Sequence, residues 1–283
     1  MSKNILKLVG AVIVLSLILI FLTLGKRSEQ NLKIYFFDVG QGDASLIVTP
    51  NGQNILIDGG PDNTLSSKIG TVLPFYERTI DLLIITHAHD DHWLGLSSLT
   101  KRYHFKRVLV PSCSSGKLYD NFILELKNSG TEIIRPAINQ RFFFKAVALT
   151  ILSGEVSEEI CAKQGLNASS IVARVVYGST NVLLMGDLEI PGEEILLNQK
   201  LLSRLKSQIL KTGHHGSTTS SGEQFLQAVN PQTAIISVGA NNTFGHPSLR
   251  ILWRLQHLKI NIFRTDLLGD ISFISDGNVW NYD

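Results

Sequence analysis

The chain has 283 residues, of which 44% are hydrophobic, 18% are charged and two are cysteines. Two cysteines are too few for a disulfide framework, and a formal net charge of +2 at pH 7 gives no support to a nucleic-acid substrate. The sequence contains neither a Gly-x-Gly-x-x-Gly nor a Walker-type loop, so nothing in it indicates nucleotide-cofactor chemistry.

The N-terminal segment predicts a membrane anchor. Residues 8–25 carry no charge, are dominated by Leu, Ile and Val, and have basic residues on both sides. Such a stretch is long enough to span a bilayer, whereas a cleaved signal peptide usually has a shorter apolar core. We expect residues 1–26 to form an uncleaved single-pass anchor, residues 27–32 a linker and residues 33–283 one hydrolase domain. The basic residues before the apolar stretch favour a catalytic domain outside the cell membrane.

The rest of the chain alternates predicted strands and helices in two halves. The second half begins near Ala148 with β segments, passes through a predicted helix at residues 192–204 and ends in alternating strands and helices. No internal repeat is present, so about 250 residues suit one large α/β domain. The many hairpins favour facing sheets over an open doubly wound sheet. The first half begins with predicted strands at residues 33–39, 44–49 and 54–58.

Six consecutive residues, His87-Ala88-His89-Asp90-Asp91-His92, predict a metal site. They follow an apolar run, residues 81–86, that is typical of a buried parallel strand, and they precede an apolar-periodic helix. His87 and His89 project the same way from extended backbone and can share one cation, while Asp91 and His92 aim toward a second. The alternative is a hydrogen-bonded polar loop at the surface, which is disfavoured because buried polar groups this dense need compensation.

Three later strand ends offer further ligands. A buried strand ends in Gly186-Asp187, and Asp187 is our candidate for the carboxylate that bridges two cations. The next strand leads to His214-His215, and a third leads through a polar loop to His246. Six of the eight histidines therefore fall in these loops.

Together these motifs resemble the metallo-β-lactamase superfamily. The resemblance covers nearly all of residues 33–276 and implies a four-layer αββα sandwich with metals at one rim. It is strongest with the branch that contains the C-terminal domain of the DNA-uptake protein ComEC, which is regarded as a nuclease. The stretches that carry it, besides the histidine loop, are Phe37–Ala44, Leu56–Gly60, Leu210–Ser217 and Arg264–Asp266.

One departure from the superfamily affects the ligand set. Many of its hydrolases place a histidine before the bridging aspartate, but no histidine lies between His104 and Asp187. Asn167 occupies roughly that position, as a metal contact or simply as a turn former. The ComEC-type branch shows the same gap. Either His214 or His215 could supply the missing ligand, and the other could protonate the leaving oxygen as a general acid.

Several residues are expected around the metals. An aspartate at the Asp58 position is, in the superfamily, mostly a group that hydrogen-bonds near the metal loop. Lys211 and the loop containing Ser217 could donate to phosphoryl oxygens, although the loop also suits an ordinary helix N-cap. The basic run at residues 101–107 could track a polyanion but is more typical of a solvated helix end. Cys113 and Cys161 could pair if the domain lies outside the cytoplasm.

The resulting expectation is a metal-dependent phosphodiesterase, most simply a nuclease acting on DNA. Two divalent cations, Zn²⁺ or Mn²⁺, would activate a water, with Asp91 as a ligand that orients it and His215 as a second catalytic candidate. Another ester, such as a cell-wall choline phosphate or a lactone, is an alternative substrate because the same metals would serve. A binding protein with a vestigial site is the third reading.

Overall fold

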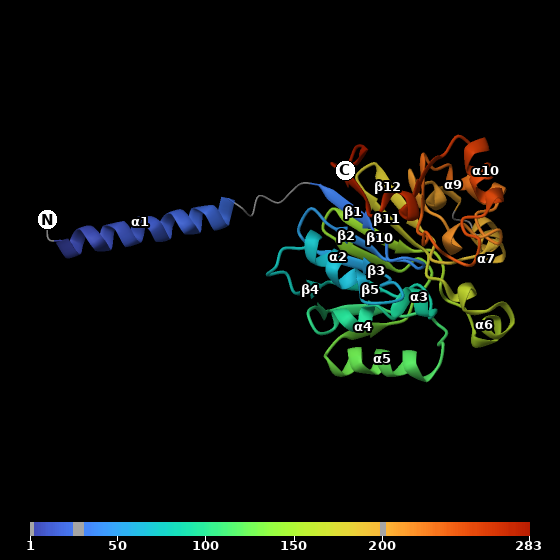
Figure 1. Cartoon of the computed structure of the whole chain (residues 1–283), viewed down its shortest axis with the longest axis horizontal. Coiled ribbons are helices and arrows are strands. Elements are labelled where there is room, and N and C mark those ends of the chain that lie inside the picture. Colours follow the sequence, from blue (N-terminus) through green and yellow to red (C-terminus); the bar gives the residue numbers. More distant parts are fainter. Residues whose placement is uncertain (1–2, 25–30, 199–201) are drawn as a thin grey trace. The chain divides into compact units, whose positions relative to one another are not determined.

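The computed structural model describes residues 3–24, 31–198 and 202–283 and divides the chain into two compact units, residues 1–30 and 31–283 (Figure 1). The first unit contains the helix α1 (Lys3–Leu24) over most of the predicted anchor. No helix in the described ranges is long and apolar enough to cross a membrane, so the transmembrane helix predicted for residues 8–25 is not supported. Most of the predicted linker lies outside the described residues.

The second unit is built on two large sheets. The first sheet has eight strands in the order β17-β16-β1-β2-β3-β5-β7-β8. Its strands β1, β2, β3 and β16 are antiparallel neighbours, whereas β3, β5, β7 and β8 run parallel. Their bounds are β1 (Leu32–Phe36), β2 (Ser45–Val48), β3 (Asn54–Ile57), β5 (Leu82–Ile84), β7 (Arg107–Leu109), β8 (Glu132–Ile134), β16 (Ile271–Ser275) and β17 (Trp280–Tyr282).

The second sheet has seven strands in the order β15-β14-β13-β12-β11-β10-β9. Four of these strands, β12 to β15, run parallel to one another. A short ribbon of β4 (Thr79–Ile80) and β6 (His104–Phe105) stands apart. The bounds in the second sheet are β9 (Arg141–Phe144), β10 (Val147–Ile151), β11 (Ala173–Tyr177), β12 (Thr180–Leu184), β13 (Ile209–Lys211), β14 (Thr233–Ile236) and β15 (Asn261–Arg264).

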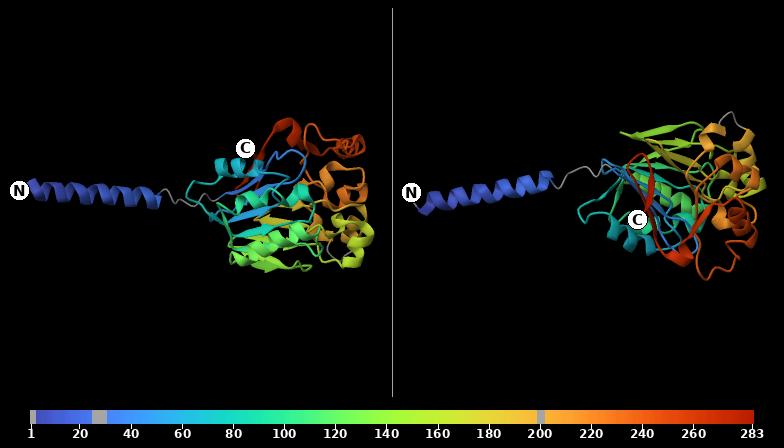
Figure 2. Two further views of the ribbon diagram at one scale, coloured as in Figure 1. Left: turned by 60° about the horizontal axis from the view of Figure 1, so that its bottom comes forward. Right: turned by 90° about the horizontal axis from the view of Figure 1, so that it is seen from above.

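Helices cover the outer face of each sheet, with α4 and α5 on one side and α9 and α10 on the other (Figures 1 and 2). The first group comprises α2 (Thr64–Val72), α3 (Asp90–Trp93), α4 (Leu96–Leu99) and α5 (Lys117–Asn128). The second half of the chain adds α6 (Glu158–Gln164), η1 (Leu166–Ser169), α7 (Ile190–Asn198), α8 (Leu202–Leu205), η2 (His214–Gly216), α9 (Glu223–Val229), α10 (Leu249–His257) and α11 (Thr265–Leu268).

The strand sequences explain these layers. In β1, Ile34 and Phe36 are buried between the two sheets, while Tyr35 points to the helices because side chains alternate along a strand. Strand β3 is buried on both faces, as parallel-sheet strands usually are. The inter-sheet cluster unites residues of both sheets, such as Ile47 and Val182, and two further apolar clusters lie under the outer helices. The predicted αββα sandwich is therefore confirmed.

The predicted helix at residues 192–204 corresponds to α7, which is described up to Asn198, and to α8, which is described from Leu202. Residues 199–201 of the predicted helix lie outside the described residues.

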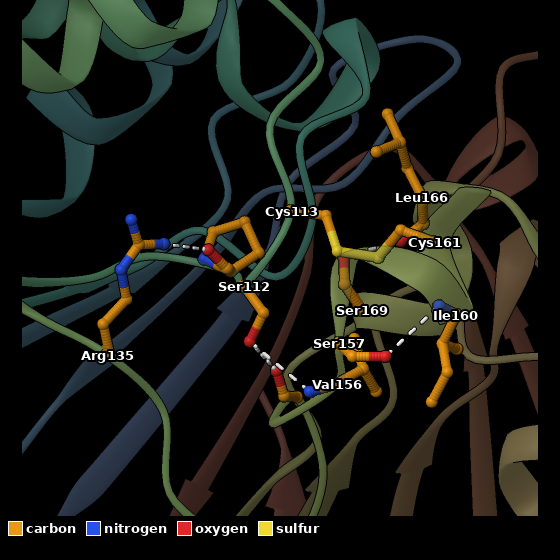
Figure 3. Close-up of a disulfide and its surroundings, with 11 residues drawn as sticks. Ser112, Cys113, Arg135, Val156, Ser157, Ile160, Cys161, Leu166 and Ser169 are labelled. Atoms are coloured by element: carbon orange, nitrogen blue, oxygen red, sulfur yellow. Dashed lines mark hydrogen bonds between the residues drawn. A yellow bond between two sulfur atoms is a disulfide. The ribbon is translucent and has the colours of Figure 1, made fainter.

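A disulfide joins a loop to a helix of the second unit (Figure 3). Cys113 lies between β7 and α5, and Cys161 lies in α6, 48 residues further along the chain. Ser112 reinforces the connection, because its hydroxyl donates to the carbonyl of Gly154 at 2.8 Å. The α6 helix leads directly into η1, which carries Asn167. The bond thus ties the start of α5 to the segment that approaches the predicted site.

Removing this disulfide should destabilise the protein. Closing a loop of this length restricts the unfolded chain, and we expect the double variant Cys113→Ser, Cys161→Ser to lose about 2–4 kcal/mol in its free energy of unfolding. Denaturant unfolding monitored by circular dichroism measures the change. Dithiothreitol should weaken the wild type by a similar amount and leave the variant unaffected. Equal stability of wild type and variant under oxidising conditions would contradict the prediction.

Candidate metal centre

The histidine loop follows β5 and turns directly into α3. His87 is fully buried, His89 is half-buried and His92 is buried in the first turn of the helix. His87 Nε2 lies 3.1 Å from His89 Nδ1, and the ring centroids of His87 and His92 are 4.1 Å apart. The strand, the turn and the helix therefore hold His87 in contact with both of the other imidazoles.

Asp58 orients His92. This buried carboxylate follows β3 and accepts from the backbone N–H of Thr86 at 2.8 Å and from its hydroxyl at 2.7 Å. Its Oδ2 also lies 2.9 Å from His92 Nδ1, so that His92 Nδ1–H donates to it. A histidine whose Nδ1–H is bound by a carboxylate presents a basic Nε2 to a metal. The structure places Asp58 beside the metal loop, where the family resemblance implied it.

Asp187 lies where the histidines converge. Its Oδ2 is 3.4 Å from His92 Nε2, 3.4 Å from His215 Nε2 and 3.8 Å from His87 Nε2. The Ser170 hydroxyl accepts from the Asp187 backbone N–H at 3.1 Å and fixes the turn after β12. One carboxylate from the second sheet thus faces imidazoles from both sheets, which is the position required of a bridging ligand.

His215 belongs to this convergent group. Its Nδ1–H donates to the carbonyl of Ser237 at 2.9 Å, which leaves Nε2 free to bind a cation. Nε2 lies 3.4 Å from Asp91 Oδ2, so His215 and Asp91 approach the same point from different sheets. The sequence left His214 and His215 as alternatives, and the geometry favours His215 as the ligand.

His214 faces a different set of partners. Its Nδ1 lies 3.1 Å from Glu189 Oε1 and 3.3 Å from the Thr219 hydroxyl. Asn167 Nδ2 is 3.4 Å from the same nitrogen, which places Asn167 beside His214. The rings of His214 and His246 have centroids 5.5 Å apart. These three residues form the rim next to the buried group.

Within the described part of the chain, four sets of three side chains have potential ligand atoms within 4.8 Å of one another. None of these sets includes His89, His214 or His246, although all three had been predicted as ligands and line the cavity described below. The four sets are His87-His92-Asp187, Asp91-His92-His215, Asp43-Asp58-His92 and Asp43-Asp187-His215.

Burial and mutual charge shift the pKa values of the group strongly. Burial and the neighbouring His92 hold the pKa of His87 well below its usual range. Burial alone would lower the pKa of His215, but the carboxylates of Asp187 and Asp43 raise it to about 9. Burial would raise the pKa of Asp187, but His215 and His92 hold it well below its ordinary value. The carboxylate at the centre is therefore ionised at neutral pH.

The donor atoms fit divalent metal ions. His92 Nε2, His215 Nε2 and Asp187 Oδ1 are buried and have no hydrogen-bond partner among the described residues. Buried polar atoms are normally paired, so three convergent exceptions indicate a ligand-binding centre. Imidazole nitrogens and carboxylate oxygens together suit Zn²⁺, and the high aspartate content also suits Mn²⁺.

Asp43 belongs to the candidate metal centre, although it was not among the residues that the sequence predicted there. It is buried in the loop between β1 and β2, 3.3 Å from His215 Nδ1 through its Oδ1. Its Oδ2 forms an ion pair with the buried Lys211 ammonium in β13. Its place between Gly42 and Ala44, in the stretch Phe37–Ala44 that carries the family resemblance, was the signal available in the sequence. Lys211 therefore lies behind His215. It is not among the residues that line the cavity, although the sequence had suggested that it could donate to phosphoryl oxygens there.

Two other predicted regions lie away from the convergent atoms. Ser217 is buried, and its hydroxyl accepts from the backbone N–H of Thr219 at 3.3 Å, so it stabilises a turn. The basic run follows α4 at the opposite end of β5 from the histidine loop. There, Lys101, Arg102 and Arg78 line a separate hollow of about 290 Å³.

A cavity of about 760 Å³ opens onto the candidate metal centre. Asp91, Asp187 and His215 of the centre line it, together with further polar residues and with the apolar residues Pro61, Trp93, Leu118 and Phe244. The lining residues are Gln41, Pro61, Ala88, His89, Asp90, Asp91, Trp93, Ser115, Leu118, Asp187, His214, His215, Phe244 and His246.

Comparison with known proteins agrees with this geometry. The family model for the metallo-beta-lactamase superfamily matches residues 37–136 and 150–240. The chain is 31% identical to ComE operon protein 3 of Bacillus subtilis over 92% of this chain and 34% of that protein. It is also 31% identical to competence protein ComA of Neisseria gonorrhoeae, over 87% of this chain and 32% of that protein. The chain thus spans about a third of the length of these curated relatives.

A solved structure shares the fold. The metallo-beta-lactamase fold protein YhfI from Bacillus subtilis superposes with a TM-score of 0.57 at 12% identity, covering 86% of this chain and 100% of that one. With the histidine loop and the Asp187 strand end at one edge of two facing sheets, this chain belongs to the metallo-β-lactamase superfamily and, within it, is similar to the ComEC-type competence proteins.

Proposed function

We propose that the second unit is a metal-dependent phosphodiesterase that hydrolyses DNA. The observation that carries this proposal is the convergence of imidazoles from both sheets on Asp187 at the floor of a cavity large enough for a nucleotide. One of the similar proteins is named as a competence protein, which supports a nucleic-acid substrate. Metal-dependent hydrolysis agrees with membership of the superfamily.

The site residues divide the chemistry among them. His87, His92, Asp91, Asp187 and His215 would hold two divalent cations, which supply an activated water and neutralise charge on the phosphoryl oxygens. Asp91 lies at the cavity surface, and its carboxylate orients the attacking water and accepts a proton from it.

His214 takes the second proton-transfer role in this proposal. Glu189 Oε1 accepts from His214 Nδ1–H, which leaves Nε2 at the cavity as the atom that delivers a proton to the leaving oxygen. We assign the general acid to His214 rather than to His215, because His215 Nε2 is directed at Asp91 and Asp187.

Metal content tests the ligand set. We expect the purified full chain to bind two Zn²⁺ or Mn²⁺ ions per molecule. The variant His215→Ala should retain no more than one, because it loses an imidazole ligand of the cation that Asp91 and Asp187 would also bind. Elemental analysis after dialysis measures the ratio. The variant His257→Ala, on α10, is the matched control and should bind as the wild type does. A wild type that retains no metal would remove the basis of the proposal.

Cleavage of end-labelled DNA tests the reaction. The metal-loaded full chain should cut the DNA, and Asp91→Ala should lower kcat by about 100-fold or more, because the water loses its orienting base. Asp276→Asn, which alters an exposed carboxylate in the turn before β17, should leave kcat unchanged. DNA that stays intact with the metal-loaded wild type would reject the nuclease assignment, and small phosphodiesters and other esters would then be tested.

We also propose that the second unit lies outside the cytoplasm and that residues 8–25 anchor the chain in the cell membrane. The Cys113–Cys161 disulfide supports the location, because such bonds persist in oxidising compartments and are rare in the cytosol. The uncharged, Leu- and Ile-rich sequence of residues 8–25 supports the anchor.

Both parts of this proposal are measurable in expressing bacteria. Protease added to spheroplasts should digest the second unit and spare a cytoplasmic marker protein. The chain should also stay with the membrane pellet in alkaline carbonate, and a variant lacking residues 1–26 should not. If free thiols are blocked at lysis, Cys113 and Cys161 should react with maleimide only after the disulfide between them is reduced. Protection from external protease would contradict the location, and extraction by carbonate would contradict the anchor.

A further inference from the structure

One wall of the cavity carries an exposed aromatic ring. Phe244 lies in the loop between β14 and α10 with 68% of its surface exposed. Its ring is stacked on His246, at 6.0 Å between centroids and 17° between planes, so the rest of the ring is open to solvent. Leaving a phenylalanine exposed forgoes the free energy of its burial, and such exposed apolar groups commonly mark binding sites.

The loop holds Phe244 in a defined position. Asn242 Nδ2 donates to the carbonyls of Gly239 at 2.8 Å and His246 at 2.7 Å. Asn242 Oδ1 accepts from the backbone N–H groups of His246 at 3.0 Å and Phe244 at 3.2 Å. One amide side chain therefore closes the loop around itself, and the ring is presented by an ordered turn.

A second apolar group belongs to the same cavity. Leu118, at the start of α5, is 65% exposed and lines the cavity together with Phe244. The segment before it carries Cys113, whose disulfide with Cys161 fixes this segment to α6 (Figure 3). The buried indole of Trp93 and the ring of Pro61 also contribute to the lining. The cavity thus combines an acidic, histidine-rich floor with apolar walls.

This combination matches the parts of a nucleotide. The floor suits the phosphodiester, and an open aromatic face suits a planar base, because stacking of a base on an aromatic side chain stabilises binding for every base type. Bases in a duplex are already stacked on each other, so a base must be unpaired to reach the ring. A lactone has no planar aromatic group to stack on this wall.

We propose that Phe244, with Leu118, forms a subsite that stacks an unpaired nucleobase next to the phosphodiester over the metal centre. The inference rests on the proposed phosphodiesterase function and narrows its substrate to single-stranded nucleic acid. Phe244 determines specificity in this assignment and takes no part in proton transfer.

Two phenylalanines of equal exposure provide a matched test. Phe143, in β9, is 67% exposed and is not among the residues that line the cavity. Phe244→Ala should raise KM for a single-stranded oligonucleotide by about 5- to 150-fold, the range expected for losing one stacked base. Phe143→Ala should leave KM unchanged, and Phe244→Trp should restore the wild-type value. Metal content should be the same in all variants.

An abasic oligonucleotide of the same length isolates the base from the phosphates. On the abasic strand, the wild type should show the raised KM that Phe244→Ala shows on the normal strand. The Phe244→Ala variant should show no further rise in KM on the abasic strand. For the wild type, duplex DNA should be a poorer substrate than the single strand. For Phe244→Ala, the two substrates should be cut equally well. Equal KM values of Phe244→Ala and Phe143→Ala on the normal strand would overturn the subsite.

The two proposals fail in distinguishable ways. If the wild type cuts neither strand, the proposed function fails, and fluorescence anisotropy with labelled normal and abasic strands still tests the subsite. A Phe244→Ala variant that loses affinity for the normal strand alone would support the subsite as a binding site. Unchanged affinity would overturn it. If the wild type cuts both strands equally well and Phe244→Ala does the same, the phosphodiesterase stands and the subsite falls.

Discussion

The interaction on which the site depends is the line of contacts from Asp58 through His92 to Asp187. Asp58 and His92 come from the first sheet and Asp187 from the second, so one imidazole links the edges of both sheets. His92 is fully buried, and its two nitrogens are directed at carboxylates 2.9 and 3.4 Å away. The distance between the sheets, set by the apolar layer between them, therefore fixes the spacing of the ligands.

Part of the cost of burying this many ionisable groups is offset by neighbouring protein groups. Thr86 satisfies Asp58 with two hydrogen bonds, and the buried Lys211 neutralises Asp43 behind His215. An isolated buried charge costs several kcal/mol, so removing one member of such a network leaves the others uncompensated. His92 Nε2 and His215 Nε2, which have no hydrogen-bond partner among the described residues, both lie 3.4 Å from Asp187 Oδ2, and a cation is the chemical species that would satisfy them together.

Catalytic potential and substrate choice come from different parts of the cavity. The floor is assembled from strand ends, whose positions the two sheets fix, and it would serve any ester that a metal-activated water can attack. Two apolar wall residues lie away from the strand ends: Phe244 in the turn closed by Asn242, and Leu118 at the start of α5, next to the segment held by the disulfide. Loops tolerate change better than strand ends, so the same floor can be combined with other walls in other proteins.

The sequence by itself determined the histidine loop and the strand that delivers Asp187, because these depend on local spacing and on the rule that parallel strands end at one edge. The αββα class followed from the family resemblance that these motifs carry. Only the tertiary structure separated His215 from His214, since both adjacent residues adopt positive φ values, 50° and 47°, that no spacing rule predicts. It alone brought Asp43 to Lys211, 168 positions along the chain, and paired Cys113 with Cys161. Such contacts depend on how two sheets pack, and packing distances are not encoded in any single segment.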